Sequence, residues 1–367
     1  MVATRITVDP ALIQWALNIT DLEVENKVQL KQNTKWLDQN FDNYLKPTVK
    51  QLGDFARRLH VPFGQLLLKH APELESIRLA FRTQANAPAQ VNLTVRDVIY
   101  EMQRKQAWFK EDSGQAAQKL SFIGSDNQSS WPETLRMLRR LLTLDHFSDA
   151  RRLYEDLRRQ LAQLGVLSMQ KGGAGLGTNR PLKVEDLRAF VLLDEYAPLI
   201  FVNQKDSFTA RIFSLIHEFV HLMRGTDELL QGIDHDVSEE RLINRVTSAF
   251  LMPHTEFVQR FDANDIAQVA RYFHVSPQSA AIRGQQLGLI ADADAIEFPE
   301  FKPQKSNSGG NPYNTALSYN DSRYMQALVV AQNTGRLQPT KAASLIGISP
   351  KMLDKTVATY SERETRR

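Results

Sequence analysis

The motif H-E-x-x-H occupies residues 217–221 and places His217 and His221 four residues apart. In an α-helix this spacing puts both imidazole rings on one face, where they can bind the same metal ion. Glu218 lies beside them and can hold or deprotonate a water molecule on that metal. The alternative is a helix with two ordinary core or surface histidines. Because the complete motif is rare in a chain with eight histidines, it favours the metal site.

The segment around the motif has the pattern of an amphipathic helix. Asp206 and Ser207 precede it as capping residues, and Gly225 follows it as a typical helix end. Apolar residues recur between them at helical spacing, namely Phe208, Ile212, Leu215, Ile216, Phe219 and Met223. The pattern therefore predicts one helix that carries the whole motif.

The composition excludes several classes of protein and site. The chain has no cysteine, which removes disulfides, thiolate metal sites and cysteine nucleophiles, so a metal must be held by histidine and carboxylate. A net charge of +3 is too small to indicate nucleic-acid binding by itself. The sequence shows no signal peptide and no run of eighteen apolar residues, so we expect a cytoplasmic protein without a membrane segment.

A hydrolytic zinc site needs three protein ligands and an open position for water, so a third ligand must come from outside the motif helix. The candidates are His235, Glu239, Glu240 and His254. Glu240 is preferred because it starts the next predicted helix and lies one turn before Asn244, which can orient it. Glu239 remains an alternative, since sequence fixes the rotation of a helix start only loosely. His254 and His235 can each stabilise an oxyanion or lie on the surface.

Strand character is predicted at residues 165–169, 187–193 and 199–202. The last two runs are separated by a turn-rich connection of five residues, which predicts a hairpin at 187–203 directly before the motif helix. The fold class is therefore α+β, with a small sheet and the motif helix as core and helical domains beside it. An edge strand of such a sheet can hold an extended peptide by main-chain hydrogen bonds.

Changes in composition and hydrophobic periodicity along the chain predict five segments. They are a degenerate helix-turn-helix-like domain (1–74), a helical region (75–160), the core with the metal site (161–300), a linker (301–312) and a C-terminal helical unit (313–367). Residues 1–70 carry nine Lys and Arg against seven Asp and Glu, so we expect DNA binding by this domain to be weak or absent. The arginine-rich stretch 136–160 predicts the solvated face of a pair of packed helices, with a surface for nucleic acid or an acidic partner as the alternative.

Several of these stretches together resemble the ImmA/IrrE metallopeptidases. The similar parts are 188–203, the H-E-x-x-H motif, Glu240-x-x-x-Asn244, Phe250-Leu251-Met252-Pro253, 272–277 with Arg283, and 287–289. Residues 47–62 are similar to the degenerate, XRE-type repressor-like domain of the longer members. The resemblance covers nearly the whole chain. There are two departures: Trp36-Leu37-x-x-Asn40 replaces the usual Trp-Glu-x-Gly, and Val246-Thr247 replaces Phe-Ala.

The resemblance implies a gluzincin-like zinc peptidase core with His217, His221 and Glu240 as Zn²⁺ ligands and Glu218 as the catalytic glutamate. It also implies a zinc metallo-endopeptidase that cleaves a helix-turn-helix repressor and so relieves repression of transcription. The partner or substrate is expected to be a repressor, antitoxin or toxin encoded by a neighbouring gene. The rival hypothesis is a non-catalytic interaction protein, such as one half of a toxin–antitoxin pair, whose zinc site is structural.

Overall fold

The computed structural model describes residues 4–20, 22, 24–37, 45–72, 92–114, 118–176, 180–226, 237–296, 298 and 311–365. Within them the chain is mostly helical and contains one three-stranded sheet, as the α+β prediction requires. It forms two compact units, one of residues 1–77 and 90–97 and the other of residues 78–89 and 98–367. The finer division into five segments stays a prediction, and all of the predicted linker 301–312 except its last two residues lies outside the described residues.

The first unit is a small helical bundle. Its elements are α1 (Pro10–Ile19), α2 (Val24–Asn33), α3 (Val49–Leu59) and the 3₁₀ helix η1 (Phe63–Leu67). Thr48 and Gln51 form a reciprocal capping box at the start of α3, which explains why the helix begins at Val49. Leu52, Phe55 and residues of α1 form its apolar core. The segment 47–62 that resembles the repressor-like domain therefore contains a capped helix with a buried apolar face.

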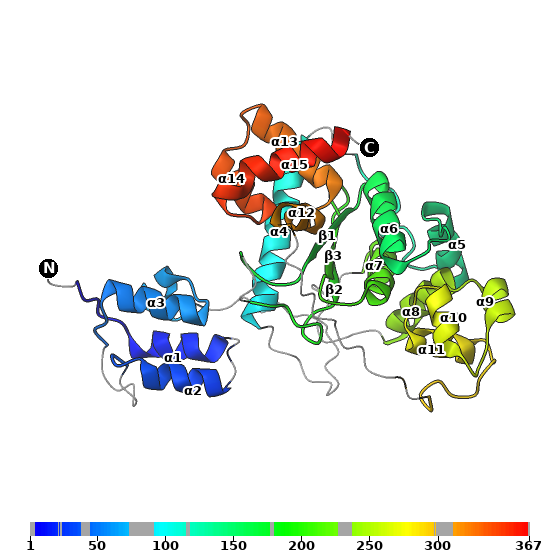
Figure 1. The fold of residues 1–367 in the computed structure, drawn as a ribbon, viewed down its shortest axis with the longest axis horizontal. Coiled ribbons are helices and arrows are strands. Elements are labelled where there is room, and N and C mark those ends of the chain that lie inside the picture. The colour runs from blue at the N-terminus through cyan, green and yellow to red at the C-terminus, as the bar shows by residue number, and fades with distance from the viewer. Residues whose placement is uncertain are drawn as a thin grey trace. The chain divides into compact units, whose positions relative to one another are not determined.

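The second unit is built around the sheet (Figure 1). Its strands are β1 (Leu167–Lys171), β2 (Ala189–Leu192) and β3 (Leu199–Asn203), in the order β1-β3-β2. β2 and β3 form the predicted antiparallel hairpin, while β1 pairs with β3 in parallel. Every strand residue is buried. The sheet therefore has layers on both faces: α6 (Ala150–Leu164) and α7 (Phe208–Arg224) lie on one side and α4 (Leu93–Ser113) on the other (Figure 1).

Two further groups of helices surround this centre. The first contains α5 (Trp131–Leu141), α8 (Val237–Leu251), α9 (His254–Arg260), α10 (Ile266–Tyr272) and α11 (Pro277–Gln286). The second contains α12 (Pro312–Tyr319), α13 (Ser322–Asn333), α14 (Pro339–Ile346), η3 (Pro350–Met352) and α15 (Leu353–Thr365). α8 packs against α7, and α12 packs against β1. Among the described residues, no helix is both long and apolar enough to span a membrane.

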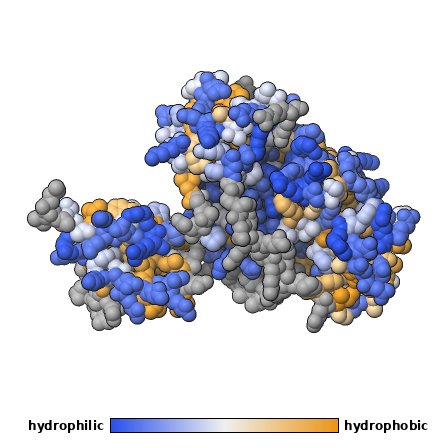
Figure 2. All heavy atoms as spheres, viewed as in Figure 1, coloured by the Kyte–Doolittle hydropathy of each residue, from blue (hydrophilic) through white to orange (hydrophobic). Residues whose placement is uncertain are grey.

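The arginine-rich stretch differs from the prediction. α5 and α6 do not form a packed pair, because α5 packs mainly against α8 and α6 against α7. The surface over both helices is mainly hydrophilic (Figure 2), but not every arginine is merely solvated. Arg158 donates to the backbone oxygens of Ser168 (2.8 Å) and Ser318 (3.1 Å), so it links α6 to β1 and α12. The periodicity identified the helices correctly but not their packing partners, which lie far away in the sequence.

A buried ion network ties α4 to β1. Glu101 Oε2 accepts a hydrogen bond from Lys171 Nζ (2.6 Å), and Glu101 Oε1 lies 3.3 Å from Lys105 Nζ. Lys105 also donates to Asn320 Oδ1 (2.7 Å), at the junction of α12 and α13. Burial raises the pKa of Glu101, but the two lysines outweigh it and hold the pKa below its ordinary value. The hydrogen bond from Lys105 therefore links α4 to the C-terminal helices, and the Glu101–Lys171 pair links α4 to the sheet.

Candidate metal centre

The ends of α7 are fixed by local chemistry. Ser207 caps its first turn by accepting a hydrogen bond from Ala210 N (3.2 Å), and Gly225 ends it with φ 69°. A Cβ atom at Gly225 would lie 2.9 Å from Gly124 Cα. Only glycine therefore fits both the left-handed backbone at this position and the close approach of the backbone segment around Gly124. The predicted helix is confirmed, and its regular geometry places His217 and His221 on one face.

α8 brings a third side chain that could hold a metal ion to this face. The described residues contain one group of three or more metal-binding side chains, which consists of His217, His221 and Glu240. His221 Nε2 lies 3.1 Å from His217 Nε2 and 3.1 Å from Glu240 Oε1, and His217 Nε2 lies 3.7 Å from Glu240 Oε1. All three side chains are at most 17% exposed. The structure thus brings together the three side chains that the sequence selected.

These separations fit a tetrahedral zinc ion. With bonds of about 2.0–2.1 Å, such an ion holds its ligand atoms about 3.4 Å apart, which lies within the range of the three measured distances. Glu240 Oε1 is buried and accepts no hydrogen bond from a described residue, although it faces both imidazoles. A donor set of two imidazoles and one carboxylate is also typical of catalytic zinc sites. The residues present therefore fit the metal that the resemblance implies.

Neighbouring groups orient the three side chains. His221 Nδ1 lies 2.7 Å from Thr226 Oγ1, a contact that leaves Nε2 available to a metal when Nδ1 carries the proton. Asn244 Nδ2 donates to Glu240 Oε2 (3.4 Å) from one helical turn away. The ring of Phe213 stacks on that of His217, with 6.2 Å between centroids. Burial raises the pKa of Glu240, but its contacts with His217 and His221 bring the pKa well below its ordinary value, so this carboxylate is charged.

The adjacent acid Glu239 has a different partner. It forms a two-point ion pair with Arg224, the last residue of α7, with 2.9 Å between Arg224 Nη2 and Glu239 Oε2. Arg224 is 5% exposed and also donates to the backbone oxygens of Asp126 (2.9 Å) and Ser129 (3.1 Å). The Glu239 carboxylate is therefore held by Arg224 at the end of α7, and Glu240 is the acid that meets the histidines.

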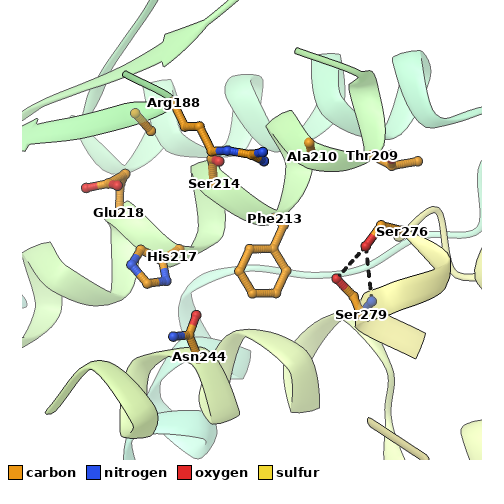
Figure 3. Close-up of a pocket in the computed structure, with 11 residues that line it drawn as sticks. Arg188, Thr209, Ala210, Phe213, Ser214, His217, Glu218, Asn244, Ser276 and Ser279 are labelled. Atoms are coloured by element: carbon orange, nitrogen blue, oxygen red, sulfur yellow. Dashed lines mark hydrogen bonds between the residues drawn. The ribbon is translucent and has the colours of Figure 1, made fainter. Parts of the chain in front are cut away.

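Glu218 and His217 lie at one end of a cavity of about 380 Å³ (Figure 3). Phe213 lies along its middle, and Ser276 and Ser279 of α11 lie at the other end (Figure 3). The remaining lining residues are Arg188, Ala189, Thr209, Ala210, Ser214 and Asn244. Glu218 is 4% exposed, so its carboxylate sits in a largely desolvated position next to the histidines. A cavity that reaches from the sheet to the histidines can admit a polypeptide side chain.

The remaining sequence candidates lie elsewhere. His254 is exposed at the first residue of α9 and is not among the residues that line the cavity. His235 lies outside the described residues. Sequence reasoning missed Thr226 and Arg224 because their partners depend on how α7 ends and on how α8 packs. It also missed Phe213, whose position one turn before His217 was the only local signal.

Residues 176–284 match the Peptidase_M78 family model, described as the IrrE N-terminal-like domain. This part of the chain is similar to that domain. The match extends from the loop before β2 into α11, so it contains His217, His221, Glu240 and Glu218, and it indicates a metallopeptidase-type function. It covers less than a third of the chain. No curated protein matches the chain.

Proposed function

We propose that the protein is a zinc-dependent endopeptidase with His217, His221 and Glu240 as metal ligands. The observation that carries this proposal is the triangle of two imidazole nitrogens and one carboxylate oxygen, with sides of 3.1, 3.1 and 3.7 Å, at the end of a cavity. A closed structural site would have four protein ligands, whereas the described residues supply three. The match to a peptidase domain over the same residues supports the same function.

A zinc ion bound there supplies a Lewis acid for the scissile carbonyl and for the attacking water. Glu218 is the general base: it takes a proton from the water and passes it to the leaving amine. Glu218 lines the same cavity as His217, so its carboxylate lies where it can reach a water molecule bound there. Asn244 and Thr226 keep Glu240 and His221 in position through their hydrogen bonds.

The substrate is proposed to be an extended segment of another protein. β2 is the outer strand on the side of the cavity, and Arg188 and Ala189 at its start line the cavity together with Glu218. A segment lying beside this end of β2 would place a peptide bond near the histidines. A folded protein must unfold locally to offer such a segment. We therefore propose a narrow specificity for one partner, a helix-turn-helix repressor or antitoxin-like protein encoded beside this one.

The test compares the wild-type protein with Glu218→Gln and with the control Glu155→Gln. Glu155 is an exposed residue of α6 that pairs with Arg151 on the surface, so its substitution should leave cleavage unchanged. Glu218→Gln keeps size and hydrogen bonding but removes the base, so it should retain zinc while cleavage falls by a factor on the order of 10² or more.

Two substrates are incubated with zinc-loaded protein, casein and the product of the neighbouring gene. Preferential cleavage of the gene product at one site supports the proposal. Rapid digestion of casein without preference would remove the narrow specificity. Tight binding of the partner without cleavage by the wild-type protein would instead favour the interaction protein with a structural zinc site.

A further inference from the structure

Arg188 gives the cavity beside the histidines a positively charged wall. It directly precedes β2, and its backbone oxygen accepts a hydrogen bond from Asn203 N (2.7 Å), so its backbone continues the hairpin. Its side chain extends from the hairpin toward α7 and passes Ser214 in the direction of Ala210 (Figure 3). The guanidinium therefore lies along the cavity that also contains Glu218.

An acid outside the cavity occupies only one donor group of Arg188. Arg188 Nη1 donates to Asp206 Oδ2 (3.3 Å), and Asp206 is not among the residues that line the cavity. Within the part of the chain that the structure describes, Nε and Nη2 of Arg188 make no hydrogen bond. Nε and one Nη group of an arginine can bind both oxygens of a carboxylate. Arg188 can therefore bind a second carboxylate and keep its contact with Asp206.

The rest of the lining suits an aliphatic side chain with a charged end. Glu218 is the acid in the lining and lies at the end near the histidines, and the ring of Phe213 lies along the middle (Figure 3). Ala210 adds an apolar contact, and the hydroxyl of Ser214 lies on the same wall as Arg188 (Figure 3). Methylene groups can therefore pack on the ring of Phe213 while a terminal carboxylate reaches the guanidinium.

We propose that the cavity receives an acidic side chain, glutamate or aspartate, from the substrate residue next to the cleaved bond, and that Arg188 determines this preference. The inference rests on the peptidase function proposed above and adds the substrate class. A segment beside the start of β2 lies next to Arg188 and Glu218 at once, because both residues line one cavity. A carboxylate there gains charge-assisted hydrogen bonds from Arg188, whereas a basic side chain is repelled.

The experiment is a calorimetric titration of the zinc-loaded full chain with three small inhibitors. All three carry a succinyl hydroxamate group, which binds zinc, and they differ in one side chain, that of glutamate, glutamine or leucine. Glutamate and glutamine have the same size, so their comparison isolates the charge. The side chain of Arg188 is 63% exposed, so we expect the glutamate compound to bind about tenfold more tightly than the glutamine compound, at the lower end for a hydrogen bond to a charged group. This preference should decrease at high salt.

Three variants test the role of Arg188. Arg188→Gln should remove the preference and leave the affinity for the glutamine compound unchanged. Arg152→Gln is the matched control, because Arg152 is also exposed and pairs with an aspartate, Asp149 (3.6 Å), but does not line the cavity. Asp206→Asn breaks the same ion pair as Arg188→Gln but keeps the charge of Arg188. The preference should therefore persist in both Arg152→Gln and Asp206→Asn.

The possible failures can be told apart. Equal affinity for the glutamate and glutamine compounds, or tighter binding of the leucine compound, would overturn the proposed preference and leave the zinc peptidase intact. Loss of the preference in Asp206→Asn as well as in Arg188→Gln would also overturn it, because Arg188 would then act only through its ion pair at the start of α7. If none of the three compounds binds, the proposed peptidase function fails, and the substrate class fails with it.

Discussion

Neutralising Glu239 and neutralising Glu240 should have opposite effects, although the two acids are adjacent in the sequence. Glu239 pairs with the buried Arg224 at the end of α7, whereas Glu240 Oε1 faces the two histidines. We therefore expect Glu239→Gln to destabilise the metal-free protein and to retain zinc. Glu240→Gln should lose zinc and change the stability of the metal-free protein little.

The magnitude follows from burial. The Arg224 side chain is 5% exposed and that of Glu239 is 22% exposed, so the pair is shielded from water on the arginine side only. Removing one partner of a fully buried pair costs about 3–5 kcal/mol, and glutamine retains one acceptor for Arg224, so we expect about 2 kcal/mol. For a unit of this size that loss corresponds to a decrease in Tm of about 4–8 °C. The amide oxygen of a glutamine at position 240 can accept a hydrogen bond from a neutral imidazole N–H, so Glu240→Gln should lower the metal-free Tm by about 2 °C or less.

Two measurements test this at pH 8. Calorimetry of chelator-treated protein gives the unfolding transition, and it can separate the two compact units if they unfold independently. Elemental analysis after dialysis against zinc gives the metal content of each variant. The reasoning would be refuted if Glu239→Gln lost its zinc while keeping the wild-type Tm. It would also be refuted if Glu240→Gln retained one zinc per chain with wild-type affinity.

Three further outcomes are expected. His217→Ala should reduce zinc affinity by a factor on the order of 10² or more because two ligands remain, and an unchanged affinity in a competition titration would contradict the site. Glu101→Gln should lower the free energy of unfolding by about 3–5 kcal/mol at neutral pH, because it leaves Lys105 and Lys171 without their carboxylate. Lys105→Met keeps the pair between Glu101 and Lys171 and should lower it by about 1 kcal/mol or less. The folded-state pKa of Glu101 is below its ordinary value of 4.5. The stabilisation of the folded protein by the Glu101 charge is therefore complete above pH 4.5 and is lost as the pH falls through the folded-state pKa. A difference in unfolding free energy between wild type and Glu101→Gln that does not narrow in acid would be inconsistent with this. Residues 1–70 carry a net charge of +2, so the full chain should bind DNA weakly and without sequence preference in a gel-shift titration with salt, and a salt-resistant, sequence-specific complex would overturn that expectation.

Much of the candidate site could be predicted because its signals are local. The helix α7 follows from a serine cap, an apolar stripe and a terminal glycine, which all lie within twenty residues of His217. The hairpin of β2 and β3 follows from two apolar runs joined by a short turn. Glu240 could be selected because it lies near the start of the helix that comes next in the chain, and Asn244 because it is one turn later.

The rest depends on contacts between distant parts of the chain, for which the sequence has no periodic signal. β1 pairs in parallel with β3, although β2 and a long connection separate the two strands in the sequence. This pairing could not be deduced from the residues of β1 itself. Arg158 has the helical spacing of a surface arginine, yet it bonds to backbone oxygens about ten and 160 positions away. Thr226 follows Gly225 without any pattern, and only the left-handed end of α7 brings its hydroxyl to His221.

The choice between Glu239 and Glu240 shows how one helix can provide two of the candidate ligands and also orient the third. Successive residues of an α-helix point about 100° apart, so two adjacent acids cannot both face the histidines. Arg224 lies three residues after His221 on the last turn of α7. Its guanidinium donates hydrogen bonds to backbone oxygens of residues 126–129, and these bonds fix the orientation of the guanidinium toward α8. Once Glu239 pairs with Arg224, the rotation of α8 is set, and Glu240 is turned toward His221. The carboxylate of Glu240 is therefore positioned by the same helix that carries both imidazoles, although Glu240 itself belongs to the next helix in the chain.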